Sequence, residues 1–317
     1  MTCVELLESL LEPEIEDADE ETFLLYSQPL PSSDLGFVDP RARTVEARVG
    51  GVDYTIHQSP GVLSSDRAGG TTGAGNRSIT PPSLLWKISP VFADWLASPT
   101  NFLFAASLLD RASTVLELGC GISPLNALAL APRVAAHLLT DQAYVQRLVQ
   151  LNIDTNITAA AGATTVASTP RSASRRKSKL TSPPQPQPPH NAARISFGTL
   201  DWETDQLPPR RSYDAVLACD CVYNDALIAP LVQTCAEACR RRRQEWERDE
   251  ETATGEDKRP RPSLCIVAQQ LRDDDVFRAW LAAFVDEFRV WRVSDDKLPE
   301  ELRPSAGFVV HIGILRE

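Results

Sequence analysis

Apolar residues along this chain fall into short continuous runs, separated by longer stretches in which they recur every three or four positions. The short runs predict buried strands and the longer stretches predict helices. This alternation indicates an α/β fold, a mostly parallel sheet covered by helices on both faces, whose last two strands can pair as antiparallel neighbours. In chain order the predicted elements are strand 115–118, helix 123–131, strand 135–140, helix 142–156, strands 194–198 and 214–219, helix 225–239, strand 264–269, helix 273–286, and strands 288–293 and 307–315.

The first 80 residues lack this alternation, and we expect them to form an N-terminal extension before a domain spanning 81–317. Residues 1–22 hold nine carboxylates and no Lys or Arg, which predicts a short helix followed by a solvated acidic tail. From Thr44 to His57 apolar and polar residues roughly alternate around two glycines, the pattern of a β-hairpin. A loop rich in Gly, Ser and Thr, about residues 61–76, follows.

Two segments inside the domain are poor in apolar residues. Residues 159–192 are rich in Pro, Ser and Thr and carry a basic cluster at 171–179, and residues 241–262 alternate charges and end in Pro-rich sequence. Neither segment offers enough apolar surface to offset its ordering entropy, so we expect disordered surface insertions. For the basic cluster, a nuclear signal or an RNA-binding arm is the alternative.

Charge and cysteine content narrow the class of protein. The formal net charge of −11 argues against a uniformly electropositive nucleic-acid surface and suits a basic protein partner, although an acidic surface that merely confers solubility fits equally well. An odd number of cysteines, seven in mostly apolar contexts, favours reduced thiols over disulfides or a metal site. No apolar run approaches the roughly 18 residues of a membrane span. We therefore expect a cytoplasmic protein without membrane contact, with the nucleus as the alternative location.

A glycine turn follows the strand 115–118 and is the first candidate site. Gly119 and Gly121 would let the backbone approach a ligand in the crevice beyond the strand ends. Pro124 stands where a dinucleotide-binding turn has its third glycine, so the turn favours S-adenosylmethionine, which has no pyrophosphate. Glu117 would point its carboxylate into the turn and hold the cofactor's ammonium indirectly. Asp141 has the spacing of a carboxylate that binds ribose hydroxyls, with a helix N-cap as the competing role.

Aromatic and acidic residues at other predicted turns add to this site. Trp86 and Trp202 stand in polar contexts, where an indole can stack on adenine or wall in a sulfonium; core packing is the alternative for each. Asp220 and Tyr223 follow the strand 214–219 and should open on the same crevice. Asp220 would orient a substrate lysine and accept its proton, and Tyr223 would hold Asp220 or wall the lysine channel. The alternative is an N-cap aspartate with a packed tyrosine.

In combination these motifs resemble the seven-strand lysine methyltransferases of the methyltransferase-like 21 group, most closely the fungal ribosomal lysine N-methyltransferase 5 subfamily. The order of the motifs is more specific than the glycine turn alone. Pro124, in place of a small residue, and the insertion 159–192 depart from the family pattern. The matching runs are Leu84–Lys87 through Trp95–Leu96, Leu116–Ser123, Thr140–Gln142, Leu200–Glu203, and Asp220–Asn224 with Leu227–Pro230.

The resemblance implies a Rossmann-like sheet of seven strands with the last one antiparallel, and a protein-lysine N-methyltransferase that uses S-adenosylmethionine. It also implies monomethylation of a lysine on a 60S ribosomal protein of the L1 family, and we expect the enzyme to act as a monomer. Together with the local arguments, the expected cofactor-binding residues are Trp86, Glu117, Gly119, Cys120, Gly121, Asp141, Trp202 and Cys219, and the expected catalytic residues are Asp220 and Tyr223.

Several other functions compete with this interpretation. The substrate could be another basic cytosolic protein, or the chain could use the same fold as a non-catalytic binding module. A nucleic-acid methyltransferase steered by the basic segments is disfavoured by the acidic net charge. A dinucleotide-dependent dehydrogenase leaves Pro124 and the Asp-x-x-Tyr element unexplained.

Overall fold

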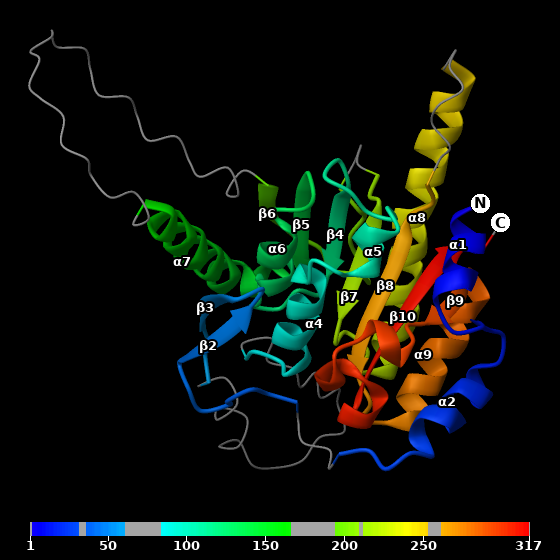
Figure 1. Cartoon of the computed structure of the whole chain (residues 1–317), viewed down its shortest axis with the longest axis horizontal. Coiled ribbons are helices and arrows are strands. Elements are labelled where there is room, and N and C mark those ends of the chain that lie inside the picture. Colours follow the sequence, from blue (N-terminus) through cyan, green and yellow to red (C-terminus); the bar gives the residue numbers. More distant parts are fainter. Residues whose placement is uncertain are drawn as a thin grey trace, which may run out of the picture.

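An eight-stranded sheet forms the centre of the molecule, with helices on both faces (Figure 1). The structure is a computed structural model that describes residues 2–31, 36–60, 84–165, 194–208, 212–252 and 261–316. Along the sheet the strand order is β1-β9-β10-β8-β7-β4-β5-β6. The bounds are β1 Glu14–Ile15, β4 Thr114–Leu118, β5 Ala136–Asp141, β6 Ile195–Thr199, β7 Ala215–Cys219, β8 Leu264–Gln270, β9 Phe288–Arg292 and β10 Phe308–Leu315.

The chain winds outward from β4 to β6 and then returns to the other side of β4, so strand order reverses between β4 and β7. β4, β5, β6, β7 and β8 pair in parallel, whereas β10 runs antiparallel to both β8 and β9. The seven strands from β4 to β10 thus confirm the predicted fold class, including the antiparallel last strand. The eighth strand, β1, comes from the N-terminal extension.

Two hydrophobic layers sandwich the sheet, because alternate residues of each strand face opposite sides. One layer packs under helices α4 (Ile88–Ala97) and α6 (Leu125–Leu130), and the other under α8 (Asp225–Thr252) and α9 (Asp274–Glu287) (Figure 1). β7 and β10 are buried along their whole length. Burial on both faces explains why these strands appear in the sequence as continuous apolar runs.

The N-terminal acidic segment is not the solvated tail that its charge predicts. Helix α1 (Cys3–Leu10) is followed by β1, which pairs antiparallel with β9, and by α2 (Ala18–Tyr26), which packs on α9. The prediction fails because the carboxylates have partners far along the chain. Glu14 forms an ion pair with Arg289, and Glu21 is buried against Arg292 at 3.0 Å and His311 at 3.3 Å.

The predicted hairpin is present and packs on the domain. β2 (Thr44–Val49) and β3 (Val52–His57) pair antiparallel across Gly50 and Gly51, which both have positive φ. Two asparagines of helix α7 (Gln146–Thr165), Asn152 and Asn156, bond the backbone of β3 along its outer edge at 2.8–3.1 Å. The expected loop 61–76 lies outside the described residues.

Two helices run further than predicted. α7 continues to Thr165 and α8 to Thr252, so residues 159–165 and 241–252 are helical where we expected disordered insertions. Alanine in the first segment, and arginine and glutamate in the second, are strong helix formers, and Arg241 pairs with Glu237 one turn away. The remaining parts of both insertions, including the basic cluster, lie outside the described residues. None of the described helices combines the length and hydropathy needed to cross a membrane.

Candidate functional site

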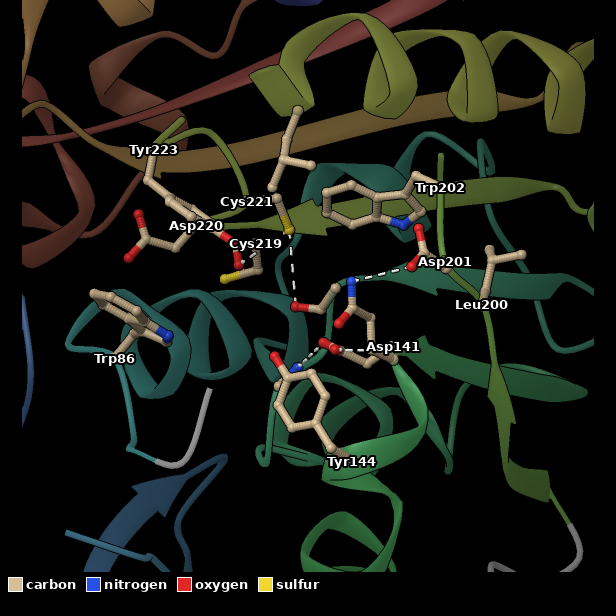
Figure 2. Close-up of a pocket in the computed structure, with 14 residues that line it drawn as sticks. Trp86, Asp141, Tyr144, Leu200, Asp201, Trp202, Cys219, Asp220, Cys221 and Tyr223 are labelled. Carbon is tan, nitrogen blue, oxygen red and sulfur yellow. Dashed lines mark hydrogen bonds between the residues drawn. The ribbon is translucent and has the colours of Figure 1, made fainter. Parts of the chain in front are cut away.

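A pocket opens beyond the carboxyl ends of β4 and β7, where the strand order reverses (Figure 2). This is the place where open α/β sheets bind ligands. Its empty volume, open mouth included, is about 670 Å³. The lining residues are Trp86, Gly119, Gly121, Asp141, Gln142, Tyr144, Leu200, Asp201, Trp202, Cys219, Asp220, Cys221, Tyr223 and Leu227.

The pocket brings together the residues predicted from the sequence, with two exceptions, Glu117 and Cys120. Asp141 and Trp202 lie toward one end, and Trp86, Asp220 and Tyr223 lie toward the other (Figure 2). The predicted crevice is therefore a single pocket with two chemically different ends.

The glycine turn forms the floor of the pocket at the Trp202 end. Gly119 and Gly121 have φ of +66° and +57°, a region that side chains rarely adopt. A Cβ atom on Gly119 would lie 2.7 Å from Cys221 Sγ and 2.9 Å from Trp202 Cζ2. Trp202 therefore packs directly over the turn, and only glycine allows that approach.

Asp141 ends β5 and binds the glycine turn. One carboxylate oxygen accepts a hydrogen bond from the Gly121 N–H at 2.8 Å and the other from the Gln142 N–H at 2.7 Å. Burial raises the pKa of Asp141, although these two hydrogen bonds act in the opposite direction. The competing N-cap role is not found, because Gln142 occupies that position in the short helix Ala143–Val145.

Glu117 and Cys120 stand behind the turn rather than in the pocket. The Glu117 carboxylate is fully buried, accepts a hydrogen bond from Asn126 Nδ2 at 2.9 Å and lies 2.9 Å from His137 Nε2. Our expectation that Glu117 points into the turn is wrong, because it shares a strand face with Val115, under α4 and α6. The Cys120 side chain packs among apolar residues of α6 and α7, and its N–H donates to the Thr140 carbonyl at 3.1 Å.

Several lining residues were not predicted, although they stand next to predicted ones. Gln142 and Tyr144 follow Asp141, and the Gln142 side chain donates to Asp201 Oδ2 at 3.3 Å. Leu200 and Asp201 immediately precede Trp202. Their position beyond the ends of β5 and β6 is the signal that could have identified them.

Asp220 occupies the opposite end and has a partner that the sequence did not suggest. Its backbone has φ of +61°, unusual for a residue other than glycine. The carboxylate is buried and accepts hydrogen bonds from Arg272 Nη1 at 2.7 Å and Nη2 at 2.6 Å, and from the Gln270 N–H at 3.2 Å. Asp220 is not the cap of α8, since Asn224 Oδ1 accepts from the Ala226 N–H at 3.1 Å.

Trp86 and Tyr223 form the aromatic walls beside Asp220 (Figure 2). The Trp86 ring lies 4.5 Å from the ring of Phe37 in the N-terminal extension, and the Arg272 guanidinium carbon lies 5.1 Å from the Trp86 ring centre. Tyr223 is 39% exposed at the pocket mouth. This end thus offers a held carboxylate between aromatic faces, an arrangement suited to an alkylammonium group.

The two cysteines in the pocket wall are not nucleophiles. Cys219 and Cys221 are buried, and burial raises the pKa of each thiol well above its ordinary value, with nearby negative charges adding to the effect. Both thiols therefore remain neutral at physiological pH. Because the thiolate is the reactive form, neither thiol acts as a nucleophile. Cys221 Sγ lies 3.1 Å from the Leu118 carbonyl oxygen and helps to fix the turn.

Comparisons with known proteins agree with these observations. Residues 185–244 match a family model described as lysine methyltransferase. A Zygosaccharomyces rouxii protein named ribosomal lysine N-methyltransferase 5 is 26% identical over 289 residues, covering 81% of this chain and 78% of its own length. A Schizosaccharomyces pombe protein named diaminohydroxyphosphoribosylamino-pyrimidine deaminase is 26% identical over 281 residues, covering 87% of this chain but 53% of its own length.

A solved structure is also similar at a low level. The S-adenosylmethionine-dependent methyltransferase SibL, in its apo form, has a TM-score of 0.41 and 16% identity, covering 73% of this chain and 56% of that one. Among the sequence relatives, the chain spans about half the length of the S. pombe protein and 78% of the length of the Z. rouxii protein. The sequence matches confirm the resemblance to the lysine methyltransferases that the motifs predict.

Proposed function

We propose that this chain, a relative of the lysine methyltransferases, is an S-adenosyl-L-methionine-dependent protein-lysine N-methyltransferase. The observation that carries the proposal is the two-ended pocket. One end presents a glycine turn, a carboxylate held by backbone N–H groups and an indole, and the other presents an ion-paired carboxylate between aromatic side chains. The first set suits an adenosyl cofactor and the second an amine, so a single pocket brings donor and acceptor together.

The residues at the turn fit S-adenosylmethionine in three respects. Gly119 leaves the space that a side chain would fill. Asp141 uses one acceptor site on each oxygen for backbone N–H groups, which leaves lone pairs for ribose hydroxyls. The Trp202 side chain lines the pocket, and its flat aromatic face can stack on adenine.

Bound S-adenosylmethionine would supply an electrophilic methyl group on a sulfonium centre. The chain must present the lysine amine in its neutral form, although a free lysine has a pKa of about 10.4 and deprotonation at pH 7 costs about 4–5 kcal/mol. Trp86 and Tyr223 would exclude water around the amine, and desolvation disfavours the charged ammonium. Both oxygens of Asp220 already accept hydrogen bonds from Arg272. We therefore assign Asp220 to orienting the amine through its remaining lone pair, and the proton to solvent at the open mouth.

For the substrate, we propose a basic protein, and specifically monomethylation of a lysine on a 60S ribosomal protein of the L1 family. Support comes from the name of the Z. rouxii relative and from the net charge of −11, which favours association with a basic partner. We propose that the chain acts on this partner as a monomer in the cytoplasm.

Methyl transfer to a ribosomal extract tests the proposal. With tritium-labelled S-adenosylmethionine, the wild-type chain should label one protein, and hydrolysis should release the label as methyl-lysine. Asp220→Asn should lower the labelling rate at least about tenfold, because the amine is no longer aligned. Asp225→Asn, an exposed aspartate at the start of α8, is the matched control and should keep the wild-type rate.

Three results would count against the proposal. Calorimetry that detects no binding of S-adenosylmethionine removes the cofactor. Label that disappears after RNase treatment points to a nucleic-acid substrate. Cofactor binding without any transfer, to the extract or to purified large subunits, supports a non-catalytic binding module.

A further inference from the structure

We propose that Arg272 is a positioning residue for methyl transfer, and that Gly36 of the N-terminal extension seals its ion pair with Asp220. The inference rests on the proposed function and deepens it. It concerns residues that lie outside the pocket lining, behind Asp220. Arg272 acts through Asp220, by fixing that carboxylate in place at the amine end of the pocket.

The geometry of the pair is that of a fixed fork. Two guanidinium nitrogens bind the two Asp220 oxygens at 2.6–2.7 Å, and Arg272 Nη2 also donates to Gln270 Oε1 at 2.9 Å. The Asp220 side chain is 1% exposed and that of Arg272 is 20% exposed. Bidentate pairing of this kind defines the direction of both groups as well as stabilising their charges.

Three unfavourable features coincide at this pair. Asp220 has a positive φ, a conformation that is strained for a residue with a side chain. The buried Nε donor of Arg272 has no hydrogen-bond partner in the described chain. A buried ion pair also carries a desolvation penalty that its attraction does not reliably exceed. Strain and unsatisfied groups concentrate at functional sites, so we infer that the pair serves the pocket rather than overall stability.

The N-terminal extension covers the outer side of the pair. A Cβ atom on Gly36 would lie 2.3 Å from Arg272 Nη2 and 2.4 Å from Gln270 Oε1, and the residue has φ of +79°. The segment is anchored to the Trp86 region by two backbone hydrogen bonds, Lys87 N–H to the Gly36 carbonyl at 2.7 Å and Val38 N–H to the Leu85 carbonyl at 2.9 Å. A larger residue at position 36 would require the Arg272 guanidinium or the Gln270 amide to shift, and we infer that the shift disturbs the pair with Asp220.

A set of arginine variants tests the role, with labelling of a ribosomal extract and calorimetry of S-adenosylmethionine as readouts. Arg272→Met should lower the rate at saturating cofactor at least about tenfold while the cofactor Kd changes less than about twofold. Arg272→Lys should restore part of the rate, since it keeps the charge but not the fork. Arg278→Met, an exposed arginine on α9 that pairs with Asp19 and Asp275, is the control and should behave as wild type.

A double variant separates positioning from mere structural support. In an Asp220→Asn background, Arg272→Met should cause no further loss, since the group it positions is gone.

Gly36→Ala tests the seal, and Gly51→Ala is its control. Gly51 has φ of +80°, and a Cβ atom added to it would meet nothing within 4 Å, so it carries the same backbone strain without the contact. Gly36→Ala should reproduce the Arg272→Met pattern, a lower rate with a nearly unchanged cofactor Kd, and Gly51→Ala should retain the wild-type rate.

Two results would contradict the positioning role. If Arg272→Met loses cofactor affinity in parallel with rate, Arg272 binds the cofactor. If the losses of Asp220→Asn and Arg272→Met add in the double variant, Arg272 acts independently of Asp220. Either result, or a wild-type rate in Arg272→Met, overturns the inference and leaves the proposed function intact. A wild-type chain that transfers no methyl group refutes the proposed function, and this role with it.

Discussion

Replacing Glu21 by Gln should destabilise the folded chain and remove part of its pH dependence. Glu21 is buried on α2, where it accepts hydrogen bonds from Arg292 at 3.0 and 3.2 Å and lies 3.3 Å from His311 Nε2. Removing one partner of a fully buried ion pair typically costs about 3–5 kcal/mol. Because the Arg292 side chain is 22% exposed and can be partly hydrated, we expect a loss of about 2–3 kcal/mol in the free energy of unfolding.

The pH dependence follows from the direction of the pKa shift. Burial alone would raise the pKa of Glu21, but the hydrogen bond and charge of His311 and Arg292 outweigh it, and the pKa is lowered. A carboxylate with a lowered pKa in the folded chain contributes stability above its unfolded pKa of about 4.3 and loses it as pH falls through the folded value. Wild type and variant should therefore differ most near pH 7 and converge in acid.

Urea unfolding followed by circular dichroism, at pH 7 and at several lower values, measures both effects. Glu20→Gln removes the same charge from an exposed position on the same helix and should change the free energy of unfolding by about 0.5 kcal/mol or less. If Glu21→Gln and Glu20→Gln have equal effects, or if the Glu21→Gln difference persists unchanged into acid, the acidic segment does not stabilise the fold through this pair.

Three other predictions concern the pocket. Gly119→Ala should weaken S-adenosylmethionine binding at least about tenfold by calorimetry, because a Cβ 2.9 Å from Trp202 Cζ2 forces that ring off the turn. Burial raises the pKa of Asp141. The folded chain therefore loses stability as pH rises and the Asp141 carboxyl becomes charged. Ribose hydroxyls favour the charged form, and affinity should therefore rise with pH and then level off, with proton release on binding. Asp141→Asn should bind more weakly and without pH dependence. Cys219 and Cys221, kept neutral by burial, should resist iodoacetamide at about pH 7.5 until urea unfolds the chain, as followed by mass spectrometry.

Local sequence signals were enough to predict the sheet and most of the pocket. A buried apolar run that is followed at once by a glycine or a carboxylate predicts which residue lies beyond the carboxyl end of that strand. Parallel strands then bring these residues together at one edge of the sheet. Gly119, Asp141 and Asp220 were identified this way. The position of Glu117 depends instead on strand parity, because alternate residues of a strand face opposite sides of the sheet. In β4 it alternates with Leu116 and Leu118, which pack on the opposite face with α8 and α9.

Arg272 and β1 could not be predicted from local pattern. A lone arginine after an apolar strand resembles any solvated strand end, and its role arises only because β7 and β8 are neighbours and Asp220 turns toward β8. β1 is two residues long, too short for a period to be visible. Its pairing with β9 depends on a contact between residues that are more than 270 positions apart.

Arg272 and β1 escape prediction for the same physical reason, because both depend on contacts between residues far apart in the sequence. For the same reason, net charge alone does not predict which carboxylates of this chain are buried. With 43 acidic and 32 basic residues, carboxylates outnumber cations, so a carboxylate is expected to be solvated wherever no cation is near in sequence. Yet the buried carboxylates Glu21 and Asp220 are each held by an arginine from a distant strand or strand end. In an acidic chain the position of the partly buried arginines is therefore more informative than the density of carboxylates. Arg292 identifies the extension as part of the fold, and Arg272 identifies the carboxylate that is held in place at the pocket.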